Sequence, residues 1–244
     1  MKTEKVALVT GAARRIGAAI TRELHASGWR VLIHYRGSAA EAVALADELE
    51  AARPGSAQPL QANLADADAL GTLAQQAQAQ WGRLDALVNN ASVYYPTAFG
   101  STTAAQFDDL VSSNLRAPLL LTQACVALMG EGAVVNIVDA LARRPAPGFA
   151  AYHAAKSGLW TLTEALALEL APRIRVNGVA PGHMLWPEYT QLSPAAQQHE
   201  LSRVPLGRLG GAQEIARCVR FLLSEDAAYL TGTVLPVDGG LSLR

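Results

Sequence analysis

The chain has 244 residues, of which half are hydrophobic and 17% are charged, and its formal net charge is −1. This composition is typical of a globular protein with a sizeable core, and the length fits one large α/β domain or two small ones. A nearly neutral chain provides no basic field for nucleic acid and no polybasic patch for a membrane. The partners predicted are therefore small molecules or further copies of the chain.

The first residues, MKTEKVALVTG, contain no apolar segment of signal-peptide length. No later run approaches the ~18 uncharged residues of a membrane span. We therefore expect the protein in the cytosol. Cys125 and Cys218 lie in apolar, helix-like patterns without the spacing of a metal site. We interpret both as reduced thiols and predict no metal.

Apolar runs alternate with helical patterns along the whole chain. Strands are predicted at residues 5–10, 30–35, 57–64, 84–91, 132–140, 174–182 and 233–240. Helices are predicted near residues 16–27, 39–52, 67–81, 107–129, 152–171 and 212–224. This alternation, with strands that are apolar throughout, predicts a parallel sheet buried on both faces. The fold class predicted is α/β, a single Rossmann-like domain over residues 1–244 with a doubly wound parallel sheet of about seven strands.

Residues 182–211 form the longest irregular stretch and are rich in Pro, Gln and Ser. A loop of this length in a compact domain often covers a functional site. We predict a substrate lid here, and disorder is the alternative.

The first predicted strand is followed by TGAARRIG at residues 10–17 and then by a helix. Gly11 permits a tight turn, Gly17 permits close helix packing, and the helix N-terminus offers N–H groups to a pyrophosphate. Arg15 stands where the TGxxxGxG pattern has its middle glycine. The motif predicts a dinucleotide site, with an ordinary strand-to-helix turn as the alternative.

The end of the second predicted strand, HYRGS at residues 34–38, indicates which nicotinamide cofactor is bound. An NAD enzyme places an Asp or Glu about 20 residues past the phosphate loop, and none stands here. Arg36 and Ser38, with Arg14, can instead hold a 2′-phosphate. The cofactor predicted is NADP(H), and the alternative is that Arg36 is a solvated surface charge.

Tyr152 and Lys156 are four residues apart on a predicted helix, so they share one face. A nearby ammonium favours phenolate and lowers the pKa of tyrosine, so such a pair can donate a proton near neutral pH. Asp139 ends the strand before that helix. We include it among the candidate catalytic residues, although an Asp in this place can simply close a strand or cap a turn.

These motifs occur in a fixed order: TGAARRIG, Asn89-Asn90-Ala91, Asn114, Tyr152-x-x-x-Lys156 and Pro181-Gly182. In that order and spacing the chain resembles the short-chain dehydrogenase/reductases over essentially its full length. The resemblance implies that residues 89–91 line the cofactor cleft and that Asn114 helps hold a proton-relay water. It also implies that Lys156 binds the nicotinamide ribose and lowers the pKa of Tyr152, which donates the proton.

Most of that family has a serine at the position of Asp139, where an ionised carboxylate would repel a developing alkoxide. Together with Arg15 and HYRGS, the runs NASVYYP (residues 90–96) and VDA (residues 138–140) resemble the pteridine reductase subgroup. That resemblance implies a pterin stacked between the nicotinamide and Tyr94, hydrogen bonds from Ser92 and Arg15 to pterin or phosphate, and proton handling by Asp139 and Tyr152. Reduction of a ring C=N bond requires an acid rather than an oxyanion hole.

The candidate residues form three overlapping groups. The catalytic group is Asp139, Tyr152, Lys156 and Asn114, and the substrate group is Arg15, Ser92, Tyr94, Asp139 and Tyr152. The cofactor group is Gly11, Arg14, Arg15, Ile16, His34, Tyr35, Arg36, Ser38, Asn63, Leu64, Asn90, Ala91, Ser92, Lys156, Pro181 and Gly182. The pair Asn63-Leu64 departs from the Asp-hydrophobic pair usual beside the adenine. The resemblance further implies a homotetramer in which Arg244 approaches a neighbouring site.

The function predicted is NADPH-dependent reduction of a dihydropterin, namely dihydrobiopterin, dihydromonapterin or dihydrofolate. One alternative is a reductase of a carbonyl substrate such as a 3-oxoacyl thioester or a sugar, against which Asp139 argues. Another is a non-catalytic NADP sensor, against which the set of Asn114, Tyr152 and Lys156 argues. The motifs do not rank the pterins, because that choice depends on the lid.

Overall fold

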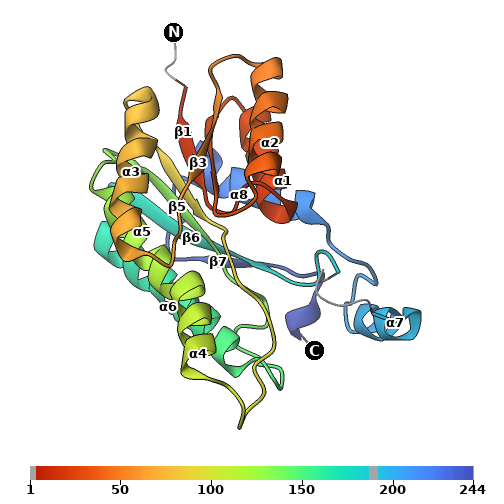
Figure 1. Cartoon of the computed structure of the whole chain (residues 1–244). Coiled ribbons are helices and arrows are strands. Elements are labelled where there is room, and N and C mark those ends of the chain that lie inside the picture. Colours follow the sequence, from red (N-terminus) through yellow and green to blue (C-terminus); the bar gives the residue numbers. More distant parts are fainter. Residues whose placement is uncertain (1–3, 187–191, 244) are drawn as a thin grey trace.

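The computed structural model describes residues 4–186 and 192–243. Within these residues seven strands form one sheet in the order β3-β2-β1-β4-β5-β6-β7 (Figure 1), and every neighbouring pair is parallel. The strands are β1 Val6–Val9, β2 Arg30–Tyr35, β3 Ala57–Gln61, β4 Ala86–Asn89, β5 Gly132–Ile137, β6 Ile174–Pro181 and β7 Val234–Val237. The predicted doubly wound parallel sheet is confirmed.

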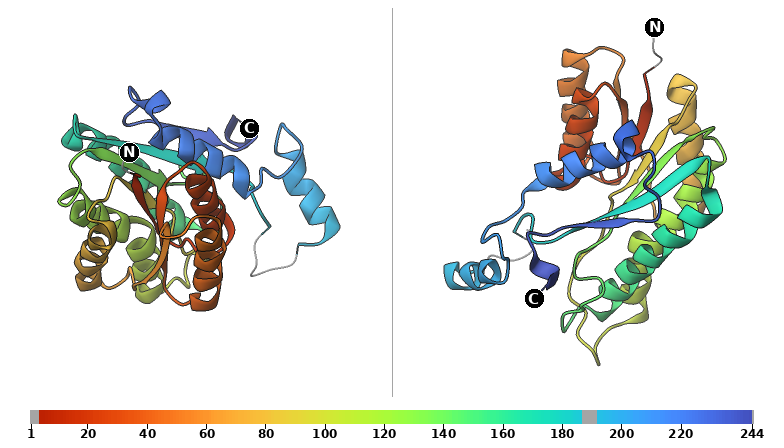
Figure 2. Two further views of the ribbon diagram at one scale, coloured as in Figure 1. Left: turned by 90° about the horizontal axis from the view of Figure 1, so that it is seen from above. Right: turned by 180° about the vertical axis from the view of Figure 1, so that it is seen from behind.

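Two layers of helices cover the sheet (Figures 1 and 2). One layer contains α1 Arg15–Ala26, α2 Ala39–Ala52 and α8 Ala212–Leu223. The other contains α3 Ala67–Trp81, α4 Ala104–Val111, α5 Ala117–Val126 and α6 Ala150–Leu170. Alternate strand residues face the two layers: Ala7 and Val9 pack in the first core, and Val6 and Leu8 in the second. Burial on both faces explains why the strands are apolar throughout.

The helix predicted over residues 107–129 is interrupted. A π-helical turn, η1 Ser112–Arg116, separates α4 from α5. The amide of Asn114 donates to the carbonyl of Leu110 at 2.9 Å, an oxygen that in a regular helix accepts from the backbone N–H four residues later. This side-chain competition widens the turn, and the apolar pattern of the sequence does not reveal it.

Part of the stretch predicted as irregular, residues 182–211, is also helical. Helix α7, Pro194–Ser202, begins after Ser193, whose hydroxyl accepts from the backbone N–H of Ala196. None of the residues of α7 is buried, so the helix has no apolar periodicity by which to predict it. It lies apart from the sheet (Figure 2). Residues 187–191 of the predicted lid, and Arg244, lie outside the described residues.

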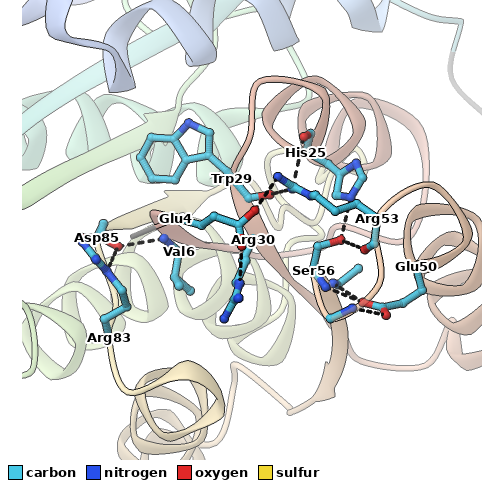
Figure 3. Close-up of polar contacts among 12 residues, drawn as sticks. Glu4, Val6, His25, Trp29, Arg30, Glu50, Arg53, Ser56, Arg83 and Asp85 are labelled. Carbon is cyan, nitrogen blue, oxygen red and sulfur yellow. Dashed lines mark hydrogen bonds and ion pairs between the residues drawn. The ribbon is translucent and has the colours of Figure 1, made fainter. Parts of the chain in front are cut away.

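Ion pairs hold the amino ends of the strands (Figure 3). Glu4 accepts from the guanidinium groups of Arg30 at 2.8 Å and Arg53 at 2.9 Å. Asp85, before β4, accepts from the backbone N–H of Val6 at 2.7 Å. These charged groups are paired with one another at the amino ends of the strands. The candidate site lies at the opposite, carboxyl ends.

No helix in the described ranges is both long and apolar enough to span a membrane.

Candidate active site

The loop between β1 and α1 lies where the strand order reverses, since β1 has β2 on one side and β4 on the other. Gly11 has a φ of +60°, and a Cβ on Gly17 would lie 2.2 Å from the carbonyl oxygen of Gly11. Only glycine fits at residue 17 without moving the backbone. The side-chain amide of Asn90 donates to the carbonyls of Thr10 at 2.8 Å and Gly11 at 3.1 Å. The phosphate loop is therefore held by the loop that follows β4.

His34, at the end of β2, supports the same loop from the other side. Its Nδ1 accepts from the backbone N–H of Gly11 at 3.1 Å, and its Nε2 lies 3.2 Å from the carbonyl of Ala62. A ring that accepts at Nδ1 donates at Nε2 and is neutral. Burial lowers the pKa of His34 to about 4. The side chain therefore positions the loop.

A cleft of about 450 Å³ runs along these loops. Its lining includes most of the predicted cofactor residues: Gly11, Arg14, Arg15, Ile16, His34, Tyr35, Arg36, Ser38, Asn63, Leu64, Asn90, Ala91 and Ser92. It also includes residues that the sequence did not single out, among them Val93, Asp109 and Ser113. Lys156, Pro181 and Gly182 do not line this cleft. The structure thus gathers the adenine and phosphate candidates in one place.

Cationic groups stand at the end of the cleft near β2. Arg36 is exposed, and Nη1 of Arg14 lies 4.0 Å from Oε1 of Glu41, in the first turn of α2. Ser38 is the N-cap residue of α2 and makes no side-chain capping hydrogen bond. Two guanidinium groups and a hydroxyl can bind a phosphate in this arrangement. The carboxylate of Glu41, beside Arg14, was not among the residues predicted from the sequence.

At the carboxyl end of β5 the side chains of Asp139 and Tyr152 meet. The Tyr152 hydroxyl donates to Oδ2 of Asp139 at 2.8 Å, and Oδ1 of Asp139 accepts from the backbone N–H of Leu141 at 2.7 Å. Lys156 is buried, and its Nζ donates to the carbonyl of Ile137 at 2.8 Å and lies 6.0 Å from the centre of the Tyr152 ring. The three predicted residues are therefore close together, with the phenol bonded to the carboxylate.

The protonation of this group differs from the sequence-based expectation. Burial, and then the Asp139 carboxylate, raise the pKa of Tyr152 well above its usual value. The net shift is thus opposite in direction to the lowering predicted from Lys156, because desolvation and a nearby negative charge favour the neutral phenol. Burial also lowers the pKa of Lys156 to about 8, with Asp139 acting in the opposite direction. At neutral pH the phenol therefore keeps its proton beside a charged ammonium.

Asn114, in the π-helical turn, is completely buried. Its amide nitrogen donates to the carbonyls of Val93 and Leu110, each at 2.9 Å. Its side-chain oxygen accepts from the Ser92 hydroxyl at 2.6 Å. Both amide hydrogens and the oxygen are therefore used inside the protein. The side chain therefore fixes the loop after β4, and neither amide hydrogen remains to bind a water.

Tyr94 packs against Tyr152. Its ring stacks on that of Phe149, with centroids 4.9 Å apart and planes at 6°. The same ring meets Tyr152 edge-on at 4.8 Å. Phe149, the residue before α6, was missed, and its place three residues ahead of Tyr152 was the available signal. The aromatic groups make a flat, apolar wall beside the Tyr152 hydroxyl.

Arg15 joins the phosphate loop to the start of the predicted lid. It is the one non-glycine residue with positive φ, +52°, in the parts of the chain that the structure describes. Its Nη2 donates to the backbone carbonyl of Trp186 at 3.1 Å. The backbone conformation explains why the general pattern has glycine here.

Comparison with known proteins identifies the family of this site. Residues 11–242 match the family model described as enoyl-(acyl carrier protein) reductase. The chain is 39% identical to pteridine reductase 1 of Leishmania tarentolae, covering 99% of this chain and 97% of that protein. The chain belongs to the short-chain dehydrogenase/reductase family. It is also 37% identical to a 3-oxoacyl-[acyl-carrier-protein] reductase of Staphylococcus aureus, covering 99% of both proteins.

A second 3-oxoacyl-[acyl-carrier-protein] reductase, from Staphylococcus epidermidis, is 35% identical over 97% of this chain and 98% of that protein. Relatives named for two different substrates are thus similar to this short-chain dehydrogenase/reductase to nearly the same degree. The chain is an oxidoreductase of this family, as predicted. The choice of substrate has to be argued from the local geometry of the site.

The pKa of His34 predicts a loss of stability in acid. The native pKa of about 4 lies below the ordinary value of about 6.5, so the unfolded chain binds more protons between these values. The contribution of neutral His34 to the free energy of unfolding, about 3 kcal/mol, is complete above pH 6.5 and is lost as the pH falls toward 4. Urea unfolding across pH 4–7 measures this change in the free energy of unfolding. His34→Gln should flatten this part of the profile relative to the exposed control His199→Gln; equal slopes would show that His34 does not titrate as described.

The positive φ of Arg15 predicts that glycine at this position gives a more stable protein than alanine, the reverse of the usual order in a helix. Arg15→Gly should be more stable to urea than Arg15→Ala by about 1 kcal/mol, because alanine keeps the strained positive φ whereas both variants lose the guanidinium. At Arg22, inside α1, the matched pair should show the usual order, with alanine more stable by about 0.5–1 kcal/mol. If alanine were the more stable substitution at both positions, the backbone at residue 15 would not be strained.

Proposed function

We propose that this oxidoreductase is an NADPH-dependent reductase of dihydropterins, producing the tetrahydro form. The observation that carries the proposal is the 2.8 Å hydrogen bond from the Tyr152 hydroxyl to Asp139. Reduction of a ring C=N bond adds hydride to carbon and a proton to the adjacent nitrogen. The phenol keeps its proton at neutral pH and can supply it to that nitrogen, and the carboxyl group beside it can return a proton from solvent.

The residues of the cleft fit NADP(H). Gly17 leaves room beside the backbone of Gly11, where any Cβ would collide, and the first N–H groups of α1 suit a pyrophosphate. When bound, the cofactor supplies the hydride. We assign the 2′-phosphate to Arg14, Arg36 and Ser38. The adenine we assign to Asn63 and Leu64, and the nicotinamide end to Lys156, Pro181 and Gly182.

Proton transfer is assigned to residues of β5 and α6. Tyr152 donates its hydroxyl proton to the substrate nitrogen, which leaves a tyrosinate. Before transfer the bond to Asp139 holds the hydroxyl in place; that bond breaks as the hydrogen moves to the substrate, and the nearby ammonium of Lys156 stabilises the anion that remains. Asp139 then returns a proton from solvent to Tyr152. Tyr94 provides an aromatic surface for a flat heterocycle, and Ser92 and Arg15 provide polar contacts at its edge.

Carbonyl reduction is the second candidate, favoured by the similarity to 3-oxoacyl-[acyl-carrier-protein] reductases. Asp139 argues against it. Reduction of a ketone develops negative charge on oxygen, and the Asp139 carboxylate bonded to Tyr152 would repel that oxygen. A sensor that binds NADP without reaction is a weaker candidate, because burial of Tyr152 and Lys156 beside a carboxylate costs free energy that cofactor binding alone does not require.

We extend the proposal to the organisation of the protein. It comprises one domain over residues 1–244 with a substrate lid at 182–211, in which His183 lies 3.1 Å from Glu200 of α7. It acts in the cytosol as a homotetramer. Light scattering coupled to gel filtration measures the assembly, and a monomeric mass would remove that part of the proposal.

The function is tested by NADPH oxidation with dihydrobiopterin, dihydromonapterin, dihydrofolate and an acetoacetyl thioester in parallel. We expect turnover with at least one dihydropterin and little with the thioester. Because the cleft presents guanidinium groups and no carboxylate among residues 34–38, kcat/KM should be at least about tenfold higher with NADPH than with NADH. Activity with the thioester alone overturns the substrate assignment, and equal use of the two cofactors overturns the cofactor assignment.

Asp139→Ser separates the two candidate substrates. Loss of the carboxyl group should lower kcat for the dihydropterin by about 10²-fold or more, as expected for removal of a general acid–base partner. Fluorescence titration of NADPH should show a dissociation constant within about twofold of the wild type, since Asp139 does not line the cofactor cleft. Wild-type pterin turnover in this variant contradicts the role of Asp139.

A further inference from the structure

We propose that Tyr95 is a positioning residue whose hydroxyl anchors the aromatic loop, residues 93–97, to α4 and so holds Tyr94 beside Tyr152. The inference rests on the proposed function, in which a pterin stacks on Tyr94. Tyr94 and Tyr95 are adjacent in the sequence but make different contacts. The first faces the candidate site, and the second bonds to the neighbouring helix.

The contact with α4 is made by the phenol oxygen of Tyr95. It lies 2.9 Å from Oδ2 of Asp109 and 3.2 Å from the carbonyl of Gln106. One hydroxyl hydrogen serves both acceptors, and the carboxylate is the stronger because it is charged. Burial, and then Asp109, raise the pKa of Tyr95, so the phenol is the donor. Asp109 also lines the cleft that we assign to the cofactor, so this contact lies at the edge of that cleft.

Two further hydrogen bonds fix the ends of the aromatic loop. The carbonyl of Val93 accepts from Asn114 at 2.9 Å, and the backbone N–H of Thr97 donates to the carbonyl of Gly148 at 2.6 Å. Gly148 precedes α6, the helix that carries Tyr152. The hydroxyl of Tyr95 is the attachment between these ends. It connects the middle of the loop to α4.

The ring of Tyr95 packs in a small cluster with Leu110, Ala151 and Tyr152. Its position is therefore set on one side by α4 and on the other by the catalytic tyrosine. Tyr94 is 43% exposed, and its ring contacts are with Phe149 and Tyr152. Because the two tyrosines share a peptide bond, displacement of Tyr95 displaces the backbone that orients Tyr94. Orientation of a stacking surface changes substrate binding more than the chemical step.

The test compares Tyr95→Phe, which removes only the hydroxyl, with Tyr229→Phe, whose parent side chain is fully exposed. Hydrogen exchange in a peptide covering residues 92–98 should become about tenfold faster in Tyr95→Phe and stay unchanged in the control. The KM for the dihydropterin should rise about five- to tenfold, with kcat and the KM for NADPH within about twofold. Asp109→Ala removes the charged acceptor of the Tyr95 hydroxyl and leaves the carbonyl of Gln106. Like Tyr95→Phe, it should make hydrogen exchange in residues 92–98 faster and raise the KM for the dihydropterin.

If hydrogen exchange in residues 92–98 is unchanged in both Tyr95→Phe and Asp109→Ala, the Tyr95 hydroxyl does not anchor the aromatic loop. A fall in kcat at constant KM overturns the positioning role, because it assigns Tyr95 to the chemical step instead. These outcomes are separate from the test of function. A wild-type protein without pterin turnover contradicts the proposed substrate, whereas the exchange measurement needs no substrate and still decides whether Tyr95 holds the loop.

Discussion

The hydrogen bond between Tyr152 and Asp139 joins the end of β5 to the first turn of α6, and the site depends on it. A buried phenol bonded to a half-buried carboxylate remains stable only if other groups satisfy and balance them. The second carboxylate oxygen accepts from the N–H of Leu141, and Lys156 places a buried ammonium near the ring. Lys156 is in turn held by the carbonyl of Ile137 at the end of the same strand. Strand and helix therefore form one connected unit at the candidate site.

A second set of hydrogen bonds connects the loops that line the cleft next to this unit. The Thr10 hydroxyl, at the end of β1, accepts from the N–H groups of Asn90 and Ala91 after β4. Asn114 continues the connection, because its amide binds Val93 from the π-helical turn that follows α4. The loop after β1, the loop after β4 and the π-helical turn are thus tied at the switch point of the sheet. The candidate site is therefore built on loops whose relative positions are fixed by hydrogen bonds.

Patterns that depend on burial could be predicted from the sequence, and those that depend on individual polar contacts could not. Strands such as β5 are apolar because both faces are covered, so their positions follow from the sequence. The π-helical turn arises from one side-chain bond of Asn114, and α7 has no buried face, so neither leaves a periodic signal. The four-residue spacing placed Lys156 near Tyr152 correctly. The pKa of Tyr152 was predicted with the wrong sign, because the depth of burial is not visible in a spacing.

Overall identity does not select the substrate, since relatives named for pterin and for 3-oxoacyl reduction are 39% and 37% identical to this chain. The proposed substrate rests instead on two charged residues, at positions where the general pattern has a glycine and a serine. Arg15 accepts an unfavourable φ of +52° and reaches the carbonyl of Trp186, while Asp139 bonds the phenol of Tyr152. We therefore base the proposed pterin substrate on the phenol–carboxyl pair, which a heterocycle with basic nitrogens can satisfy and an apolar acyl chain cannot.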